Sequence, residues 1–381
     1  MRKMIDKTTT VPTNTVIKFR LDRGHIKIPV QLDNKISCEL IYDTGAAVSV
    51  IDKGYSKKIL NKKNIIKSNK IGIFYLDSIK IANKIELIKP LFFKMDLSGL
   101  IRDSTTCGIL GTNINHLFYT KISYEDTTIQ FSTEPILKKE PIKPIKFIQN
   151  AKGKIAENVY NICIPLTVGD STYKTVFDTG NNTAFLVNLK DKEKEDISKF
   201  SITKKYNTYG SYADVHGKFD TIMVNEKIQA DLAVGYFKMG KFMMETGVYR
   251  SNKKETKETK DLLSVGAMGY KVLRNFNIYI DWKNNDLYID KNKYYKENTT
   301  FPEINIGEKD KVFLVSSILI ASFWDKNGLE VKSTVSEING KNVKDITKSE
   351  LDNLNENQSI YSLKFINRKG EEKILNKEKN K

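Results

Sequence analysis

The sequence predicts a mainly β protein with two homologous β-barrel lobes and a small C-terminal α+β domain. Val, Ile, Thr, Tyr and Phe are abundant, and Gly, Asn and Asp interrupt them at short intervals, which is typical of short strands joined by tight turns. One supersecondary unit occurs twice in the first 300 residues. The chain has 381 residues, 40% of them hydrophobic, which is enough for two or three domains with cores of their own.

The repeated unit begins with a hairpin that ends in Asp-Thr-Gly. The first copy runs from residue 25 to Asp43-Thr44-Gly45, and the second runs from residue 161 to Asp178-Thr179-Gly180. In each copy an apolar stretch containing a proline leads through a polar turn into a second apolar stretch. We therefore expect each hairpin to place an Asp at the end of its second strand.

The similarity continues beyond the two hairpins. Gly108-Ile-Leu-Gly111 in the first copy corresponds to Ala267-Met-Gly269 in the second, and each precedes a helical turn, a strand and a closing hairpin. The distance from the first Asp to its glycine is 68 positions, and that from the second Asp is 91. The second copy therefore carries a net insertion of 23 residues.

These boundaries divide the chain into four segments. Residues 15–134 form the first lobe and residues 155–297 the second. The stretch 135–154 is expected to be a connector without regular structure, because its prolines interrupt strands and helices. Residues 300–381 form the C-terminal domain.

Two equivalent Asp residues in a repeat predict an acid pair. A single Asp-Thr-Gly is an ordinary turn sequence, but an ionised Asp is costly to bury twice at matching corners unless it is paired. If the lobes pack with twofold pseudo-symmetry, Asp43 and Asp178 meet and share one proton. The ionised Asp then activates a water molecule and the protonated Asp polarises a carbonyl, without a metal or another cofactor. Thr44 and Thr179 could bond across the lobes, and Gly45 and Gly180 leave room for backbone amides near the carboxylates.

On these residues the chain resembles the aspartic peptidases, with the doubling of pepsin-like enzymes and the compact lobes of retropepsin-like domains. The resemblance covers about residues 15–297 and includes Asp43-Thr44-Gly45-Ala46, Asp178-Thr179-Gly180, the 108–111 turn and the stretch 268–276. It implies an aspartic-type endopeptidase, a hydrolase acting on polypeptides, with one catalytic Asp from each lobe.

Two features of the chain depart from that family pattern. The family has Ser, Thr or Ala after the glycine; Ala46 agrees, whereas Asn181 does not, although its amide could bond the nearby carboxylate. The flap that should cover a substrate has three candidates, Tyr75, Tyr209 and Tyr212, each of which is equally compatible with an ordinary surface hairpin. The alternative function is therefore a catalytically inactive peptide-binding protein that keeps the fold.

The C-terminal segment has a different pattern of elements. Apolar strands at 312–320 and 334–343, the second with an Asn339-Gly340 turn, precede a short amphipathic helix at 346–354 and two closing strands. This order resembles a PDZ domain of the kind attached to bacterial peptidases. The resemblance implies that the domain binds an extended peptide or protein ligand by β-augmentation; a packing domain is the alternative.

The basic composition has two interpretations. The net charge is +17 and the pI is about 9.4, which could indicate an anionic partner. No cluster of Lys and Arg alternates with aromatic residues, so we expect solvated basic faces and no nucleic-acid partner. The cysteines and histidines suggest neither a disulfide framework nor a zinc site. We expect Cys38, Cys107 and Cys163 to be small buried residues, and His25, His116 and His216 to be structural or exposed.

The compartment is not fixed by the sequence. No stretch is apolar enough to span a bilayer, and residues 1–15 lack the apolar core of a signal peptide. The resemblance to PDZ-linked peptidases suggests the bacterial cell envelope or periplasm. We expect a monomer.

Overall fold

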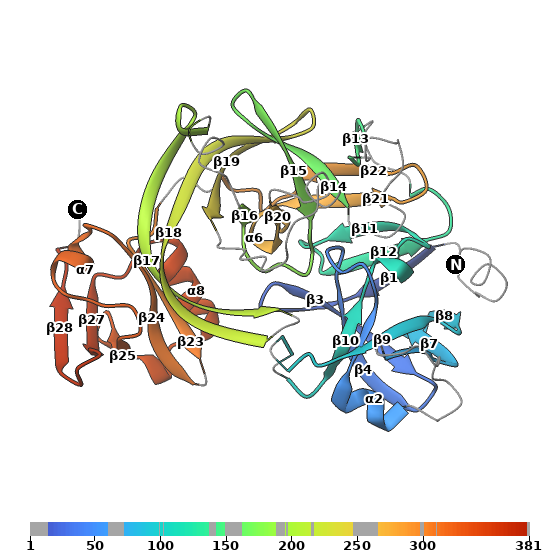
Figure 1. Ribbon diagram of the computed structural model, residues 1–381, viewed down its shortest axis with the longest axis horizontal. Coiled ribbons are helices and arrows are strands. Elements are labelled where there is room, and N and C mark those ends of the chain that lie inside the picture. Colours follow the sequence, from blue (N-terminus) through green and yellow to red (C-terminus); the bar gives the residue numbers. More distant parts are fainter. Residues whose placement is uncertain are drawn as a thin grey trace. The chain divides into compact units, whose positions relative to one another are not determined.

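The computed structural model describes residues 14–59, 72–98, 100–101, 103–136, 142–148, 162–187, 195, 197–214, 217–246, 266–297, 301–309 and 311–378. Strands predominate, which confirms the mainly β fold class (Figure 1). The chain forms two compact units. The first consists of residues 1–200 and 230–297, and the second of residues 201–229 and 298–381.

The N-terminal part of the first unit, residues 14–136, is here called the first half. Its elements are β1 (Asn14–Lys18), β2 (Arg20–Asp22), β3 (His25–Leu32), β4 (Ile36–Tyr42), β5 (Val50–Asp52), α2 (Lys53–Ile59), β6 (Ile73–Tyr75), β7 (Ser78–Ile81), β8 (Ile85–Ile88), β9 (Leu91–Met95), β10 (Thr106–Leu110), α3 (Thr112–Asn115), β11 (Tyr119–Ser123) and β12 (Thr128–Ser132).

The expected first hairpin consists of β3 and β4, which pair antiparallel. Asp33 and Asn34, in the three-residue connection between the strands, have φ of 47° and 54°, the left-handed conformation that tight hairpin turns favour in Asp and Asn. Strand β10 then lies between β4, to which it is parallel, and β5, to which it is antiparallel. The sheet order β6-β9-β5-β10-β4-β3-β7-β8 therefore places the residue after β4 beside the end of β10.

The second half comprises the remaining described residues of the first unit. Its elements are β13 (Ile145–Lys146), β14 (Cys163–Val168), β15 (Ser171–Phe177), β16 (Phe185–Val187), the end of β18 (Gly217–Val234), β19 (Phe237–Thr246), β20 (Gly266–Met268), α6 (Tyr270–Leu273), β21 (Phe276–Asp281) and β22 (Asp286–Lys291).

The strand pairings of the second half repeat those of the first. Strands β14 and β15 form the antiparallel hairpin, and β20 runs parallel to β15 and antiparallel to β16. Strand β16 is parallel to β19, as β5 is to β9. The end of β18 pairs with β14 as β7 pairs with β3. In each half, a later strand (β10 or β20) therefore lies directly beside the second strand of that half's hairpin.

One six-stranded sheet contains strands from both halves, in the order β1-β12-β11-β21-β22-β13 (Figure 1). Its central pairing is antiparallel, with Thr120 opposite Ile280 and Ile122 opposite Ile278. Ile122 and Ile278 are fully buried, so this sheet joins the halves through a common apolar core. Strand β13 corrects the expectation that the 135–154 connector has no regular structure; residues 137–141 and 149–154 lie outside the described part.

The second unit contains strands and a helix close to those that the sequence predicts after residue 312, and in addition a strand at 304–309 and a helical turn at 323–326 that it did not predict. They are β23 (Ile304–Lys309), β24 (Val312–Leu319), α7 (Phe323–Lys326), β25 (Thr334–Ile338), β26 (Lys341–Asn342), η1 (Val343–Asp345), α8 (Lys348–Glu356), β27 (Ser362–Ile366) and β28 (Glu372–Asn376). Thr347 and Glu350 form a reciprocal capping box that fixes the start of α8. Asn339 and Gly340, with φ of 54° and 80°, form the expected turn.

The sequence did not indicate that β17 (Ser201–Asp214) belongs with the second unit. This strand pairs antiparallel with β24, with Tyr206 opposite Leu319 and Thr208 opposite Ser317. Tyr206 is fully buried. In the sequence, residues 201–229 lie between segments of the second half. In the structure, they belong to the compact unit that also contains residues 298–381.

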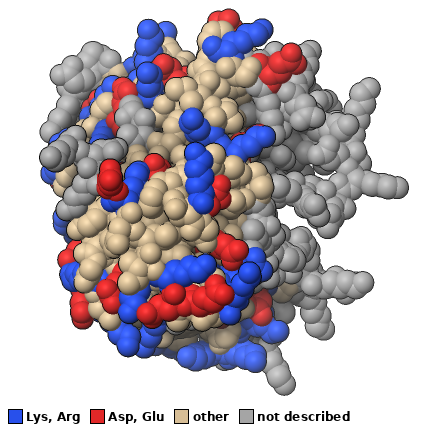
Figure 2. Space-filling view, turned by 90° about the vertical axis from the view of Figure 1, so that its left-hand side faces the viewer, with Lys and Arg blue, Asp and Glu red and all other residues tan. Residues whose placement is uncertain are grey.

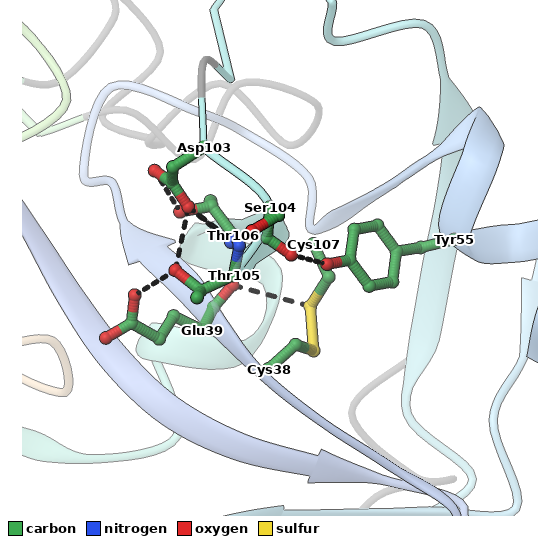
Figure 3. The surroundings of a disulfide bond; sticks show 8 residues. All are labelled: Cys38, Glu39, Tyr55, Asp103, Ser104, Thr105, Thr106 and Cys107. Atoms are coloured by element: carbon green, nitrogen blue, oxygen red, sulfur yellow. Dashed lines mark hydrogen bonds between the residues drawn. A yellow bond between two sulfur atoms is a disulfide. The ribbon is translucent and has the colours of Figure 1, made fainter.

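Cys38 of β4 and Cys107 of β10 are buried as expected, but a disulfide joins them, which was not expected from the sequence (Figure 3). The Cα atoms are 5.9 Å apart although the residues are 69 positions apart in the chain. Parallel pairing of β4 and β10 causes this proximity, and spacing alone does not reveal it. Cys163 is unpaired and partly buried.

Replacement of both Cys38 and Cys107 by Ala should lower the free energy of unfolding by about 4 kcal/mol, because the crosslink closes a long loop in the unfolded chain. Urea denaturation measures this difference. The matched control is Cys163→Ala, which removes a sulfur but no crosslink. Equal stability of the double variant and wild type under oxidising conditions would contradict the disulfide.

Candidate active site

Asp43 follows β4 directly and is held by backbone groups. Its own N–H donates to the carbonyl of Leu110 at 3.1 Å. Its carboxylate oxygen Oδ1 accepts hydrogen bonds from the N–H groups of Gly45, at 2.7 Å, and Ala46, at 3.0 Å. The first bond fixes Asp43 to the end of β10, and the other two stabilise negative charge on its side chain.

Asp178 occupies the corresponding position after β15. Its N–H donates to the carbonyl of Met268 at 3.0 Å, as Asp43 does to Leu110. The N–H of Gly180 donates to Asp178 Oδ1 at 2.9 Å. The two halves therefore present their acids in the same way, at the end of a hairpin strand and beside the strand behind it.

Thr44 and Thr179 join the two turns by reciprocal hydrogen bonds. The N–H of Thr44 donates to Thr179 Oγ1 at 3.0 Å, and the N–H of Thr179 donates to Thr44 Oγ1 at 3.0 Å. Each hydroxyl also donates across to the other half, Thr44 to the Phe177 carbonyl at 2.7 Å and Thr179 to the Tyr42 carbonyl at 2.9 Å. Both Thr residues are fully buried. Four bonds in a dry environment thus fix the separation of the two acids.

The glycines after the Thr residues allow this close approach. A Cβ atom at Gly45 would lie 2.4 Å from Cγ of Asp178, and one at Gly180 would lie 2.3 Å from Cγ of Asp43, closer than van der Waals contact allows. Each turn therefore lies against the acid of the other half, which excludes any larger residue at 45 and 180. The two carboxyl groups hydrogen-bond each other directly.

The electrostatic environment makes the two acids share a proton. Burial raises the pKa of Asp178 well above its ordinary value, and the adjacent negative charge of Asp43 raises it further. Burial also raises the pKa of Asp43, whereas the N–H of Gly45 and the hydrogen bond from Asp178 partly oppose the increase. Because like charges at this distance cannot both form easily, the pair retains one proton over a wide pH range.

Asn181 does not interact with the acid in the way the sequence suggested. Its Oδ1 accepts hydrogen bonds from the N–H of Thr183 at 2.9 Å and from the Thr183 hydroxyl at 2.8 Å. The amide side chain therefore forms a local turn. The backbone of Asn181 keeps the arrangement of Ala46: its carbonyl accepts from Tyr270 N–H at 2.7 Å, as Ala46 accepts from Thr112 at 2.8 Å.

The flap candidates lie in different parts of the structure. Tyr75 ends β6, opposite Leu91 of β9. Tyr209 lies in β17, and its described contacts are with the second unit: Lys309 Nζ donates to its hydroxyl at 2.9 Å and Lys332 Nζ lies 4.5 Å from its ring centre. The backbone of Tyr212 is in β17, and its side chain lies outside the described residues. None of these contacts indicates a lid over the acids.

The sequence did not identify His25 as part of the site. Its Nε2 lies 3.0 Å from the carbonyl oxygen of Gly180, a partner that the sequence did not indicate. The contact joins residues 155 positions apart, so no local pattern reveals it. One signal was available: His25 begins the strand of the first repeat.

The described residues contain no group of three or more His, Cys, Asp or Glu side chains arranged to hold a metal ion. Within the same residues, no helix combines the length and apolar character that membrane crossing requires. On the face shown in Figure 2, basic side chains are interspersed with acidic ones. No family model and no curated protein matches the chain.

Thr44→Val should lower the free energy of unfolding by about 2–4 kcal/mol, because it leaves the Thr179 N–H and the Phe177 carbonyl buried without partners. Urea denaturation measures the loss. Thr44→Ser is the matched control, since it keeps the hydroxyl and should remain close to wild type. Equal effects of the Val and Ser changes would show that the hydroxyl bonds do not hold the halves together.

Asp178→Asn should stabilise the protein at neutral pH, by about 1–3 kcal/mol. A carboxyl whose folded pKa is raised binds more protons when folded, so its favourable contribution exists in acid and is lost as pH rises through the folded pKa. The advantage of the Asn variant should therefore grow from pH 3 to pH 7 in thermal unfolding. The exposed Asp77→Asn is the control. A difference that does not change with pH would contradict a shared proton.

Proposed function

We propose that the protein is an aspartic endopeptidase whose two lobes are the first and second halves described above. The observation that supports this most strongly is the direct contact of two buried Asp carboxyls, held by reciprocal Thr hydrogen bonds from the two halves. A carboxyl pair with one proton supplies a base and an acid in one place. The substrate class is polypeptide, and the reaction needs no covalent enzyme intermediate.

The asymmetry of the pair favours one assignment of roles. Asp43 is the better anion, because, beyond the burial that raises both pKa values, the charge of Asp43 and the hydrogen bond between the carboxyls raise the pKa of Asp178, whereas the same hydrogen bond lowers that of Asp43. Asp43 therefore takes a proton from the attacking water, while protonated Asp178 donates to the carbonyl oxygen of the scissile bond. When the gem-diol collapses, Asp43 gives its proton to the leaving nitrogen, and Asp178 regains a proton from the diol hydroxyl. The enzyme thus returns to its starting state.

We propose a PDZ-like docking role for the second unit, supported by the order of its strands and helices along the chain. A peptide adding to β23 would lie between that strand and α8. Asn355 of α8 already bonds Ile306 there: its side-chain Oδ1 accepts from the Ile306 N–H at 3.0 Å and its Nδ2 donates to the Ile306 carbonyl at 2.9 Å. A ligand that augments β23 must displace this side chain.

The alternative function is a peptide-binding protein that does not cleave. Asn181 is the observation that favours it, because its side chain bonds Thr183 and leaves Asp178 without the hydroxyl donor that Ser or Thr would supply. The two functions differ in one measurable property. Both bind an extended peptide, but only the peptidase consumes it.

Asp43→Asn should reduce cleavage of an unfolded protein by about 10³-fold or more, because it removes the base without changing side-chain size. Cleavage is followed from acidic to neutral pH with and without pepstatin. Asp77→Asn, an exposed change outside the pair, should cleave like wild type.

Absence of pepstatin-sensitive cleavage by the wild type across this pH range would overturn the peptidase. Calorimetry then decides the alternative, since a binding protein of this fold should still bind pepstatin without cleaving any substrate.

A further inference from the structure

The turn between β2 and β3 extends from the first half onto the second. Arg23 and Gly24 form this turn with φ of 52° and 83°, so that Asp22 and His25 lie opposite each other across the hairpin. A Cβ at Gly24 would be 2.7 Å from Cδ1 of Tyr270 and 3.2 Å from Cβ of Asn182. Both the conformation and the close approach require glycine. The turn therefore packs against Asn182, in the loop that follows Asp178, and against Tyr270.

His25 bonds the central peptide group of that loop. Because the Gly180 carbonyl can only accept, the bond of 3.0 Å requires the proton on Nε2. Gly180 is thereby held on three sides: its N–H by Asp178, its Cα against the Asp43 carboxylate, and its carbonyl by His25. Movement of the imidazole would move the turn that carries one acid and contacts the other.

The charged groups around His25 determine when its ring carries charge. Burial lowers its pKa, whereas the Gly180 carbonyl and the nearby carboxylate of Asp43 oppose that decrease. The positive charge of Lys27 also lowers the pKa of His25, whereas the negative charge of Asp22 raises it. Lys27 and Asp22 form an ion pair with each other, with 2.6 Å between Nζ and Oδ2. His25 is therefore neutral near neutral pH and becomes a cation beside Asp43 in acid.

We propose that His25 is a positioning residue of the Asp43–Asp178 pair, which fixes the Gly180 turn from the opposite half and in acid adds a positive charge that keeps the pair ionised. The kinetic part of this inference rests on the proposed peptidase function. The structural part does not, because it concerns only the protonation and stability of the pair.

Two substitutions separate the bond from the charge. His25→Gln keeps an N–H donor within reach of the Gly180 carbonyl but cannot become a cation, whereas His25→Leu removes both. Since a neighbouring cation lowers the pKa of a carboxyl, its loss should move the acid limb of the pH profile of kcat/KM upward in the Gln variant, by about one pH unit. At its optimum, the Gln variant should stay within about threefold of wild type.

The Leu variant should lose about tenfold or more in kcat with little change in KM for a short substrate, because the loosened turn misplaces an acid. His116→Gln is the matched control: it removes another histidine that contacts a backbone carbonyl, that of Thr112, and should change neither quantity. If the Leu variant keeps the wild-type kcat and the Gln variant keeps the wild-type acid limb, the inference about His25 is wrong.

A readout without catalysis keeps this test independent of the peptidase proposal. Carbon-13 NMR of Asp carboxyls follows the first protonation of the pair in full-length protein, active or not, and it should occur at higher pH in His25→Gln than in wild type.

Unfolding supplies the second measurement. A histidine with a lowered folded pKa stabilises above its unfolded pKa, and this stability is lost as pH falls toward the folded value.

The stability deficit of His25→Gln relative to wild type should therefore shrink between pH 7 and pH 5. Suppose that the wild type cleaves nothing, but the carboxyl protonation and the stability deficit both shift in His25→Gln as described. This result would overturn the peptidase proposal and support the role of His25. Cleavage by wild type, with neither shift nor kinetic effect in the variants, would overturn the role of His25 alone.

Discussion

The reciprocal hydrogen bonds between Thr44 and Thr179 are the constraint on which the rest of the site depends. Each Thr offers its N–H to the hydroxyl of the other and its own hydroxyl to a carbonyl of the opposite half. Because all these groups are buried, removal of either hydroxyl while the halves stay packed leaves its partners without water or another hydrogen bond. The bonds therefore hold two acids together against a repulsion that would otherwise drive the turns apart.

Much of this arrangement is readable from the sequence because it depends on local pattern. The alternation of apolar residues, the turns at residues 33–34 and 339–340, and the second Asp-Thr-Gly each specify their own neighbourhood. The side chain of Asn181 was not predicted correctly, because its amide was considered a donor to the carboxylate, whereas its Oδ1 accepts from Thr183. The repetition of the hairpin unit was enough to predict that the two Asp-Thr-Gly turns lie next to each other.

The remainder depends on contacts between distant segments. The pairing of β4 with β10 places Cys38 beside Cys107, and the seating of Gly24 on Tyr270 brings His25 to Gly180. The pairing of β17 with β24 likewise makes Tyr209 part of the second unit, where its hydroxyl accepts from Lys309. The residues next to them in the chain do not reveal these contacts; only the position of His25 at the start of the repeat gave a signal.

The position of the disulfide has a consequence for the order in which the protein is made. Both cysteines, and all strands of the sheet that supports Asp43, precede residue 111. During synthesis this sheet can be completed and covalently locked while residue 178 is still inside the ribosome. Asp43 can then already accept the hydrogen bonds from the N–H groups of Gly45 and Ala46. It still lacks Asp178, the carboxyl with which it shares a proton. The contact between the two carboxyls therefore forms only after the second half has been made, when β21 adds to β11.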